Sequence, residues 1–416
     1  SPAKAKKIQS ILGSMYVVKS SFGHLTNLKG KAKGVDVSNG FQPVFEVVKG
    51  KQLKMLKDAK KGCDKVILAA DEDREGEAIA WHTANLLKLD NSCKNRISFN
   101  EITKKAILKA IENPRKIDFD LVNAQKARQV LDYLVGFEVS PVLWKHVQPK
   151  LSAGRVQSIA AKLVVEKDVE VSKFKENKYF STVGNFEKNI LGNLDKKFTK
   201  KDDVITFMNA CKFATFKVID ISVKRVDKRP PPPFVTVSLQ AEVGKRYSMP
   251  AKSIMSILQK LYENGYITYH RTDSTNLSDD CKESIKNYIL KEYSKKYLRL
   301  RNYKTKSKCA QEAHEAIRPT NINLKDLGED SLENKIYSLI WKRTVASQMA
   351  PLVTDVYTMK INISERSEQF IAKAEKVIFE GYRAVYNENF KDSDENSDSD
   401  EELSDMFGEV KEGDVL

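Results

Sequence analysis

Three acidic side chains stand at two-residue spacing at Asp71, Asp73 and Glu75, directly after the apolar run of residues 66–70 and before a helical pattern. A short continuous apolar run predicts a strand buried on both faces, and ligands in α/β sheets bind at the carboxyl ends of such strands. In an extended chain Asp71 and Asp73 point to the same side, and Glu75 can join them at the turn. Closely spaced carboxylates repel one another unless a hard cation neutralises them, so the pattern predicts a Mg²⁺ site. One or two acids would suit a helix N-terminus, but three at this rhythm favour the metal.

A second candidate for chemistry is Tyr269, which stands two residues before Arg271 in the string Tyr-Ile-Thr-Tyr-His-Arg-Thr-Asp-Ser-Thr of residues 266–275. A phenol with a pKa of about 10 is a poor nucleophile at neutral pH and needs help. If the strand-like run is extended, Arg271 lies on the same side as Tyr269. Its guanidinium would then stabilise the phenolate and the charge of a phosphoryl transition state. A lone Tyr-x-Arg is a weak signal, because edge strands often carry aromatic residues and cations.

The residues around the carboxylates alternate between helical and strand-like patterns. Gly13 closes a first helix, and Thr103 can cap a later one that begins at Lys104. Alternation of this kind predicts an α/β domain with a largely parallel sheet. The elements that we predict here are helices at residues 2–12, 52–61 and 75–89 and strands at residues 16–21 and 66–70.

The remainder of the chain has a helical stretch followed by mixed elements. Residues 118–172 are nearly all helical in pattern, with breaks at Ser140-Pro141 and Leu151-Ser152. The polyproline run of residues 229–233 cannot join a regular helix or sheet and marks a boundary. Further predicted elements are strands with a short helix within 179–226, helices at 238–247 and 251–264, a β-rich run at 266–269 after Gly265, and strands at 356–363 and 370–379.

The chain carries a net charge of +15, but its acidic residues are concentrated at the end. From residue 392 onward there are eleven acidic residues and one Lys, which leaves 70 basic and 45 acidic residues, or +25, in the rest. A net charge this positive over the residues before 392 favours nucleic acid as a partner. The alternative is a Lys-rich composition whose charges only keep the surface solvated. Residues 392–405 form a Ser/Asp/Glu-rich segment, which we expect to be a disordered insertion.

Length and cysteine usage narrow the class of protein further. At 416 residues the chain exceeds one ordinary core, so we expect two to four domains. It has no apolar run long enough to span a bilayer. The absence of any Cys-x-x-Cys pair fits a reducing compartment and argues against a zinc ribbon in this stretch. The five cysteines are Cys63, Cys93, Cys211, Cys281 and Cys309.

The carboxylate string matches the Toprim signature, a strand that ends in Asp-x-Asp-x-Glu, which topoisomerases, primases and some nucleases share. Residues 266–275 decide among these classes, because they resemble the active-site segment of type IA DNA topoisomerases almost residue for residue. The resemblance is closer to bacterial topoisomerase I than to the decatenating topoisomerase III. Further strings that resemble family motifs, in the family's order, are residues 1–6, 125–132, 151–158 and 313–320.

The resemblance assigns a role to individual residues of this chain. Tyr269 would attack a DNA phosphodiester, and Lys4 and Arg271 would stabilise phosphate charge beside it. The metal ligands for Mg²⁺ would be Asp71, Asp73 and Glu75. The implied DNA-binding residues are Arg128, Asp132, Arg155, Gln157, His314 and Arg318.

The implied fold is multidomain α/β and α+β, with a Toprim α/β domain and with helical and strand-rich domains arranged as a type IA topoisomerase torus. The implied activity is ATP-independent relaxation of negatively supercoiled DNA by a monomer, through a 5′-phosphotyrosine link, with single-stranded DNA preferred. The implied boundaries are a Toprim domain at 1–117, the first half of a helical DNA-binding domain at 118–173, a strand-rich hinge arm at 174–228 and 356–416, and a tyrosine domain at 229–355.

The chain departs from the family pattern at both ends. The family has a catalytic Glu immediately before the Ser-Pro-Ala-Lys string that here begins at Ser1, and family members continue beyond the Gly-Asp-x-Leu segment of residues 413–416. We therefore expect the chain as written to be a trimmed part of a longer enzyme and not to relax DNA by itself. The compartment stays open between a bacterial cytoplasm or nucleoid and a eukaryotic organelle of bacterial origin. The alternative functions are a Toprim metal nuclease or primase-like enzyme without a covalent link, and a DNA-binding module that has lost catalysis.

Overall fold

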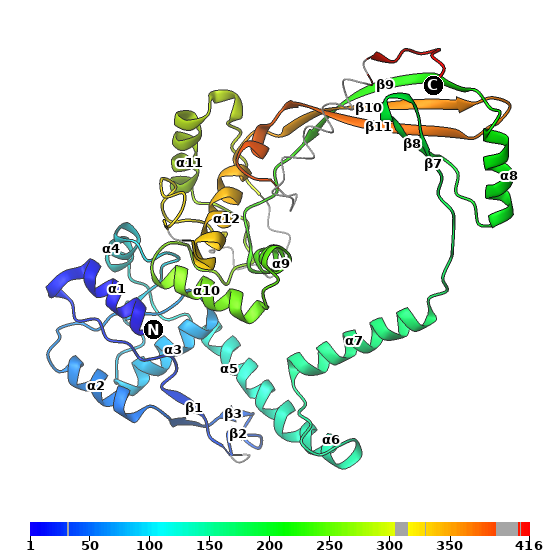
Figure 1. The fold of residues 1–416 in the computed structure, drawn as a ribbon. Coiled ribbons are helices and arrows are strands. Elements are labelled where there is room, and N and C mark those ends of the chain that lie inside the picture. The colour runs from blue at the N-terminus through cyan, green and yellow to red at the C-terminus, as the bar shows by residue number, and fades with distance from the viewer. Residues whose placement is uncertain (31–32, 304–314, 329, 388–406, 408) are drawn as a thin grey trace. The chain divides into compact units, whose positions relative to one another are not determined.

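The structure, a computed structural model, describes the chain except for residues 31–32, 304–314, 329, 388–406 and 408 (Figure 1). It divides into two compact units, which are each built from separate stretches of sequence. The first unit consists of Ser1–Phe174, Pro250–Thr272 and Gln311–Thr320. The second consists of Lys175–Met249, Asp273–Ala310 and Asn321–Leu416. In the part of the chain that the structure describes, no helix has the length and apolar character needed to cross a membrane.

The first unit begins with an α/β region in which a strand, a helix and a second strand follow one another. Strands β5 and β6 pair in parallel, with α3 as the connection between them. Helix α3 packs against α5 (Phe119–Leu134) through Ala80, Ala84 and Val122, which form an apolar cluster with Leu68 of β5. The helices of this region are α1 (Pro2–Leu12), α2 (Gly50–Lys60), α3 (Arg74–Leu86) and α4 (Lys104–Glu112). The strands are β1 (Thr26–Leu28), β2 (Val35–Asp36), β3 (Gln42–Pro43), β4 (Phe45–Val47), β5 (Leu68–Ala69) and β6 (Arg96–Ile97).

The predicted helices of this region are confirmed to within two or three residues, and their ends have the expected causes. Gly13 ends α1 with a positive φ of 71°, and Thr103 caps α4 by accepting a hydrogen bond from the amide of Ala106. The predicted largely parallel sheet is wrong in extent. Among the described residues the parallel pairing is limited to β5 with β6, and β1–β4 and β2–β3 are antiparallel pairs.

The predicted strand at residues 16–21 does not form. The side-chain amide of Gln9 replaces the strand partner, because it donates to the carbonyls of Gly13 and Tyr16 and accepts from the amide of Val18. A polar side chain of α1 therefore satisfies two backbone groups of this segment, the Tyr16 carbonyl and the Val18 amide, that a neighbouring strand would otherwise pair.

The first unit also contains four further helices. Of the two breaks predicted in the helical stretch, the one at Leu151-Ser152 is confirmed as the gap before Arg155. The one at Ser140-Pro141 is wrong, because the chain stays helical through a π-helical turn at Val135–Val139 into the helix Ser140–His146. Helix α10 is amphipathic, and its buried residues Ile254, Leu258, Leu261 and Tyr262 follow helical spacing. The helices are α5 (Phe119–Leu134), α6 (Ser140–His146), α7 (Arg155–Lys173) and α10 (Ala251–Glu263).

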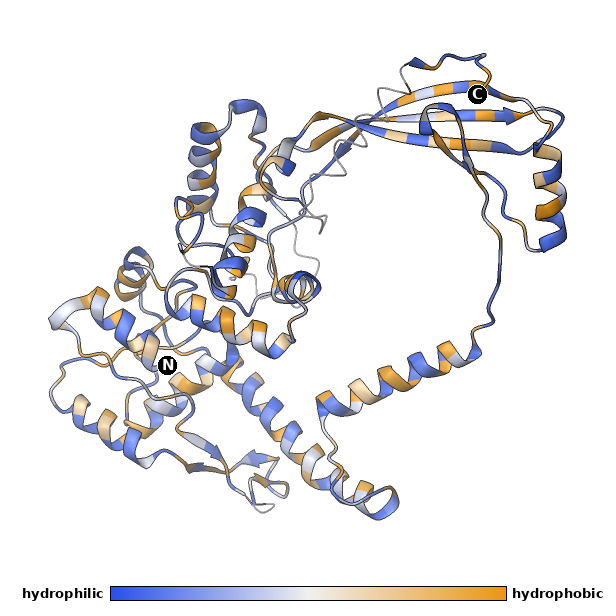
Figure 2. Cartoon of the chain, viewed as in Figure 1, coloured by the Kyte–Doolittle hydropathy of each residue, from blue (hydrophilic) through white to orange (hydrophobic). Residues whose placement is uncertain are grey.

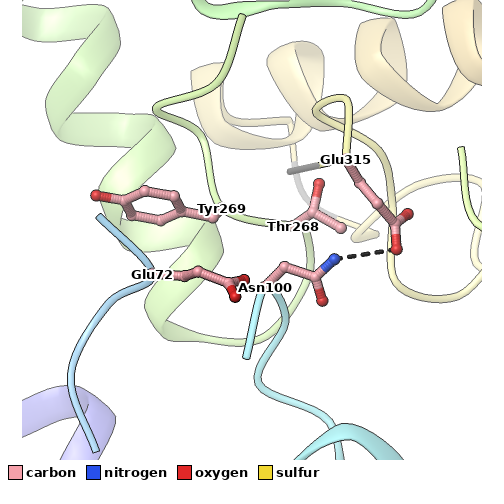
Figure 3. A pocket seen from close by; sticks show the side chains of 5 residues that line it. All are labelled: Glu72, Asn100, Thr268, Tyr269 and Glu315. Atoms are coloured by element: carbon pink, nitrogen blue, oxygen red, sulfur yellow. Dashed lines mark hydrogen bonds between the residues drawn. The ribbon is translucent and has the colours of Figure 1, made fainter. Parts of the chain in front are cut away.

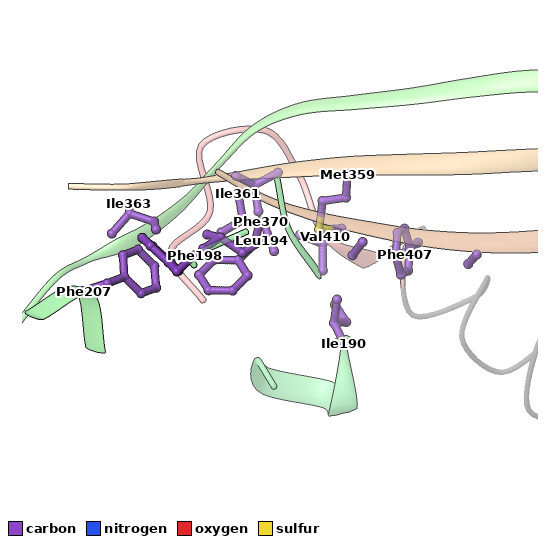
Figure 4. Close-up of a cluster of buried hydrophobic side chains, with 13 residues drawn as sticks. Ile190, Leu194, Phe198, Phe207, Met359, Ile361, Ile363, Phe370, Phe407 and Val410 are labelled. Atoms are coloured by element: carbon purple, nitrogen blue, oxygen red, sulfur yellow. The ribbon is translucent and has the colours of Figure 1, made fainter. Parts of the chain in front are cut away.

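The second unit contains a five-stranded antiparallel sheet in the order β7-β8-β11-β10-β9. Figure 2 shows hydrophobic and hydrophilic residues alternating along its long strands, as expected for a sheet with one covered face. Phe198, Phe207 and Phe370 belong to the apolar cluster that covers this face (Figure 4). The strands are β7 (Val183–Asn185), β8 (Leu191–Leu194), β9 (Phe216–Lys228), β10 (Leu352–Ile363) and β11 (Gln369–Phe379).

The predicted strands at 356–363 and 370–379 are confirmed within β10 and β11. Polyproline residues 229–233 join no regular element, as predicted, and α9 follows them. The helices of the second unit are α8 (Lys201–Cys211), α9 (Thr236–Tyr247), α11 (Asp279–Glu292) and α12 (Leu332–Ser347). The acidic segment predicted to be disordered, residues 392–405, lies outside the described residues.

Candidate active site

The carboxylate string occupies the turn between β5 and α3. Asp73 is the N-cap of α3, and its Oδ1 accepts a hydrogen bond from the Gly76 amide at 2.7 Å. The turn is too tight for a side chain at Gly76, because a Cβ there would lie 2.2 Å from the carbonyl oxygen of Asp71. Capping and close approach together place Asp71 and Asp73 at the carboxyl end of β5, where the sequence predicted them.

Lys4 reaches this turn from the first turn of α1. Its Nζ lies 2.6 Å and 2.8 Å from the two carboxylate oxygens of Asp71. The same ammonium lies 4.7 Å from the ring centroid of Tyr262, whose hydroxyl is 3.4 Å from Asp71 Oδ1. The predicted catalytic lysine therefore forms a largely buried ion pair with the first carboxylate of the string.

Tyr269 lies on the other side of the same turn. Its hydroxyl donates to Asp73 Oδ2 at 2.5 Å, and only 5% of the residue is exposed. The ring packs edge-on against Tyr262, with centroids 5.2 Å apart, and against His270 at 5.5 Å. The predicted nucleophile, lysine and first two carboxylates are thus brought together within one unit.

Burial raises the pKa of the Tyr269 phenol well above its ordinary value, and the negative charges of Asp73 and Asp71 raise it further. The charge of Arg271 acts in the opposite direction. At neutral pH the phenol is therefore protonated, and its reaction as a nucleophile requires a proton acceptor in contact with it. Asp73 is the group that already accepts its hydrogen bond.

The segment that carries Tyr269 is bent, and the predicted β-rich run at 266–269 is wrong. Its backbone is shared among different partners: the amide of Thr268 donates to the carbonyl of Arg318, and the amide of Tyr269 donates to the carbonyl of Asn100. The pairing in this run is an isolated bridge between Ile267 and Pro319. An extended chain therefore does not place Arg271 beside Tyr269. Arg271 is exposed, and its effect on the phenol is electrostatic.

Behind Tyr269 lies a small pocket lined by Glu72, Asn100, Thr268, Tyr269 and Glu315 (Figure 3). Asn100 donates to Glu315 Oε1 at 3.0 Å across this pocket. Arg318 donates to Glu315 Oε2 at 2.5 Å and lies 3.0 Å from Glu101 Oε2. Arg318 is 6% exposed, so its guanidinium joins two carboxylates in the interior. The contact of Arg318 with DNA stays a prediction, and a phosphate would have to displace both ion pairs to reach the guanidinium.

Glu75, the third predicted metal ligand, has its hydrogen-bond partners on other segments of the first unit. Its Oε2 lies 3.2 Å from His24 Nε2 and 3.3 Å from Gln125 Nε2. Carboxylate oxygens suit Mg²⁺ by their chemistry. Among the described residues, however, no three His, Cys, Asp or Glu side chains are grouped closely enough to hold one ion. The donor types fit a magnesium site, whereas the side-chain arrangement directs each carboxylate to a protein partner.

The predicted DNA-binding residues of α5 and α7 lie near one another at the surface. Asp132 accepts from Arg155 Nε at 2.8 Å and from Nη2 at 3.1 Å, and Arg128 Nε is 4.0 Å from the same carboxylate. Gln157 donates to Ser152 Oγ at 3.2 Å. All are exposed polar groups, so the structure makes them available to a ligand. His314 lies outside the described residues.

Several residues of the site were not found from the sequence. Tyr262 follows the apolar spacing of α10, so the pattern reads as a core position, although its hydroxyl contacts Asp71. Asn100 and Glu315 are single polar residues whose significance depends on a contact between distant segments. No local periodicity indicates such a contact.

Two buried histidines of the first unit give the fold a pH dependence. Burial lowers the pKa of His82 to about 4, helped by the nearby charges of His24 and Lys126. Burial also lowers the pKa of His270 to about 4, helped by Arg271 and Lys4. The unfolded chain binds more protons than the folded one between pH 4 and the ordinary histidine pKa of about 6.5. The contribution of these histidines to the free energy of unfolding is therefore fully present above about pH 6.5 and is lost as the pH decreases toward 4.

We expect each histidine to contribute a loss of about 2 kcal/mol between pH 7 and pH 5. His82→Phe keeps a ring beside Phe45 and Trp81 but cannot titrate, so urea unfolding of this variant should show a shallower loss over this range. If the free energy of unfolding fell equally between pH 7 and pH 5 in the wild-type protein and in His82→Phe, the lowered pKa of His82 would not be the cause.

Comparisons with known proteins show the family of the chain. The sequence model described as DNA topoisomerase matches residues 116–416, and the Toprim domain model matches residues 1–102. The chain is 41% identical over 431 residues to a "DNA topoisomerase 1 type prokaryotic" of Acanthamoeba polyphaga mimivirus, which covers 95% of this chain and 50% of that protein. It is also 41% identical over 436 residues to DNA topoisomerase 1 of Rickettsia bellii, with 95% and 54% covered. The chain thus spans about half the length of these curated relatives.

Among solved structures, the full-length topoisomerase I of Thermotoga maritima matches with a TM-score of 0.85 and 37% sequence identity. The match covers 100% of this chain and 69% of that one. The predicted fold class, a Toprim α/β domain with helical and strand-rich parts, is confirmed, and the finer domain boundaries stay a prediction. The chain is similar to bacterial-type topoisomerase I and belongs to the type IA family of DNA topoisomerases.

Proposed function

We propose that the protein that contains this chain relaxes negatively supercoiled DNA by cutting one strand through Tyr269. One observation supports this most directly: the Tyr269 hydroxyl lies 2.5 Å from Asp73, at the turn where Lys4 pairs with Asp71. A nucleophile, a proton acceptor and a cation are therefore adjacent. The family of the chain and its topoisomerase relatives support the same reading.

In the proposed reaction the Tyr269 oxygen forms a bond to the phosphorus while the bond from phosphorus to the 3′ oxygen breaks. The phenolic proton passes to Asp73, and the leaving oxygen takes up a proton to become a 3′ hydroxyl. The DNA stays attached through its 5′ phosphate, so the bond energy is conserved and religation is the reverse step. Lys4 and Arg271 supply positive charge to the phosphoryl group. No ATP is consumed, because the strain of supercoiling drives relaxation.

The DNA partner is proposed to be single-stranded or negatively supercoiled, since the site must accommodate an unpaired strand. Arg128, Arg155 and Gln157 are exposed and offer donors to the backbone. Asp132 orients Arg155 through its two hydrogen bonds. The protein is proposed to act as a monomer.

Strand cutting through Tyr269 is testable with a single-stranded oligonucleotide labelled separately at each end. The full-length protein is mixed with the DNA and denatured at once. We expect the label at the 3′ end to migrate with the protein and the label at the 5′ end to be released, because the tyrosine keeps the 5′ phosphate. Cleavage with both labels free of protein would instead support the metal nuclease alternative. Binding without cleavage would support a DNA-binding module.

Mg²⁺ is proposed to be held by Asp71 and Asp73, with Glu75 as a further donor. When bound, it would neutralise these carboxylates and attract the phosphate. We expect relaxation to stop in EDTA and to return with Mg²⁺ in the wild-type protein. Asp71→Ala combined with Asp73→Ala should prevent that recovery and should also weaken Mn²⁺ binding measured by electron paramagnetic resonance. Unchanged Mn²⁺ affinity in the double variant would show that the string is a helix cap alone.

A further inference from the structure

The residue that carries this inference is Arg96 of β6, which is fully buried. Burial of a guanidinium is unfavourable unless all of its donors are satisfied, and its pKa is lowered by that burial. In the structure the N–H groups of Arg96 donate to one carboxylate and to several backbone carbonyls. An arginine retained at such a position needs a role that a well-packed apolar residue would not fill.

The carbonyls that Arg96 contacts belong to the turn with the predicted metal ligands. Its Nη1 donates to the carbonyl of Ala70 at 2.8 Å, and its Nη2 donates to the carbonyl of Asp71 at 2.7 Å. Nη1 also contacts the carbonyl of Ile97 on its own strand. The planar guanidinium therefore ties β6 to the end of β5 at the point where the chain leaves the strand.

The third side of Arg96 is held by Glu77, in the first turn of α3. Arg96 Nε donates to Glu77 Oε2 at 3.0 Å. Glu77 also accepts two hydrogen bonds from Arg115 and one from the amide of Asp118, all at 2.8 Å. Burial would raise the pKa of Glu77, but the hydrogen bonds from Arg115 and the charge of Arg96 outweigh it and keep that pKa below its ordinary value. The pair is therefore an ionised bridge between β6 and α3.

Arg96 thus binds both ends of the turn between β5 and α3. It donates to the carbonyls of residues 70 and 71 at the start of the turn and to Glu77 at its end. We propose that Arg96 is a positioning residue, which fixes the backbone of residues 70–77 so that Asp71 faces Lys4 and Asp73 faces Tyr269. It acts through main-chain atoms and does not touch DNA. This rests on the proposed function, because the geometry it fixes is that of the proposed reaction.

Arg115 provides a matched control within the same network. It pairs with the same Glu77, but its side chain is 36% exposed, and its hydrogen bonds in the described part of the chain go to Glu77 and to the carbonyl of Lys116 and not to residues 71–73. Its backbone pairing with Arg96 is independent of its side chain. Replacing either arginine disturbs the buried ion pair, whereas only a change at Arg96 releases the turn.

The experiment compares Arg96→Lys with Arg115→Met in the full-length protein. A lysine ammonium keeps the charge but cannot bind two carbonyls and a carboxylate in one plane. We expect Arg96→Lys to form the covalent adduct about 100-fold more slowly, since misplacement by roughly 1 Å has an effect of that size. Oligonucleotide affinity should stay within about twofold, and Mn²⁺ affinity should fall by about tenfold, the range seen for lost outer contacts of a metal site. Arg115→Met should lower the melting temperature with little change in adduct rate or Mn²⁺ affinity.

Equal losses of adduct rate and of Mn²⁺ affinity in the two variants would overturn the proposal, because the network would then act through stability alone. If Arg96→Lys does not fold, Glu77→Gln replaces it. This change keeps the shape of the bridge but removes its charge, and it should reduce the adduct rate in the same direction. Failure of the wild-type protein to form any adduct would overturn the proposed function instead, and the Mn²⁺ measurement would still decide the role of Arg96.

Discussion

Tyr269→Phe is expected to abolish the covalent protein–DNA adduct while single-stranded DNA still binds. The ring is nearly buried and packs against Tyr262 and His270, so phenylalanine keeps these contacts. What is lost is the hydroxyl and its hydrogen bond to Asp73. Leaving that carboxylate with one partner fewer should reduce stability by about 1–3 kcal/mol, which is small beside the loss of the nucleophile.

The control for this variant is Tyr266→Phe. Tyr266 stands in the same string, but it is 36% exposed, whereas Tyr269 is 5% exposed. We expect Tyr266→Phe to form adduct at the wild-type rate. The assignment fails if Tyr269→Phe still yields DNA that remains on the protein after denaturation, or if both variants lose the adduct together.

Gly76→Ala is expected to have the second large effect. The added Cβ would lie 2.2 Å from the carbonyl oxygen of Asp71 and 2.9 Å from its amide nitrogen, and these are backbone atoms that cannot rotate away. The turn must therefore move, and with it the two aspartates. We expect a stability loss of about 1–3 kcal/mol, as for other overpacked sites. The adduct rate should fall by about 100-fold, as expected for misplaced reacting groups.

Gly62→Ala is the matched change, because nothing lies within 4 Å of a Cβ at that position. It should leave both the melting temperature and the adduct rate close to wild type. Thermal unfolding and adduct kinetics on the same preparations separate the two effects of Gly76→Ala. If Gly76→Ala still formed adduct at the wild-type rate, the backbone of the turn between β5 and α3 could change its conformation without affecting the reaction.

The parts of the fold that local chemistry controls could be predicted from the sequence. Caps set the limits of α1 and α4, because Gly13 and Thr103 satisfy backbone groups within a few residues. The apolar runs of β10 and β11 alternate over many residues, so their strand character is unambiguous. The carboxylate string and Tyr269 were found as motifs, and Asp73 does contact Tyr269, whereas Glu75 contacts His24 and Gln125 instead.

What escaped prediction depends on partners far away in the chain. Residues 266–270 look like a strand in isolation, but Asn100 and Arg318 take their backbone hydrogen bonds and bend them. The segment at 16–21 has strand-like residues, yet Gln9 satisfies it. Arg318 has the character of a surface cation, and only the fold reveals that Glu101 and Glu315 enclose it. In each case a tertiary contact outweighs local propensity.

The pairing of β9 with β10 has a mechanical consequence. Lys228 and Leu352 are opposite one another at one end of this ladder, so the chain leaves the sheet and re-enters it at adjacent points. Counting this pair, the ladder has twelve residue pairs up to Ile363. A force that pulls both attachments in the same direction along the strands is carried by the covalent backbones of the two strands and places little load on the hydrogen bonds between them, which are perpendicular to it. A force that spreads the two attachments apart loads only the outermost pair, and the ladder then peels one bond at a time. The paired strands β9 and β10 therefore resist a pull along their length, but they separate under a smaller force when their two attached ends are pulled apart.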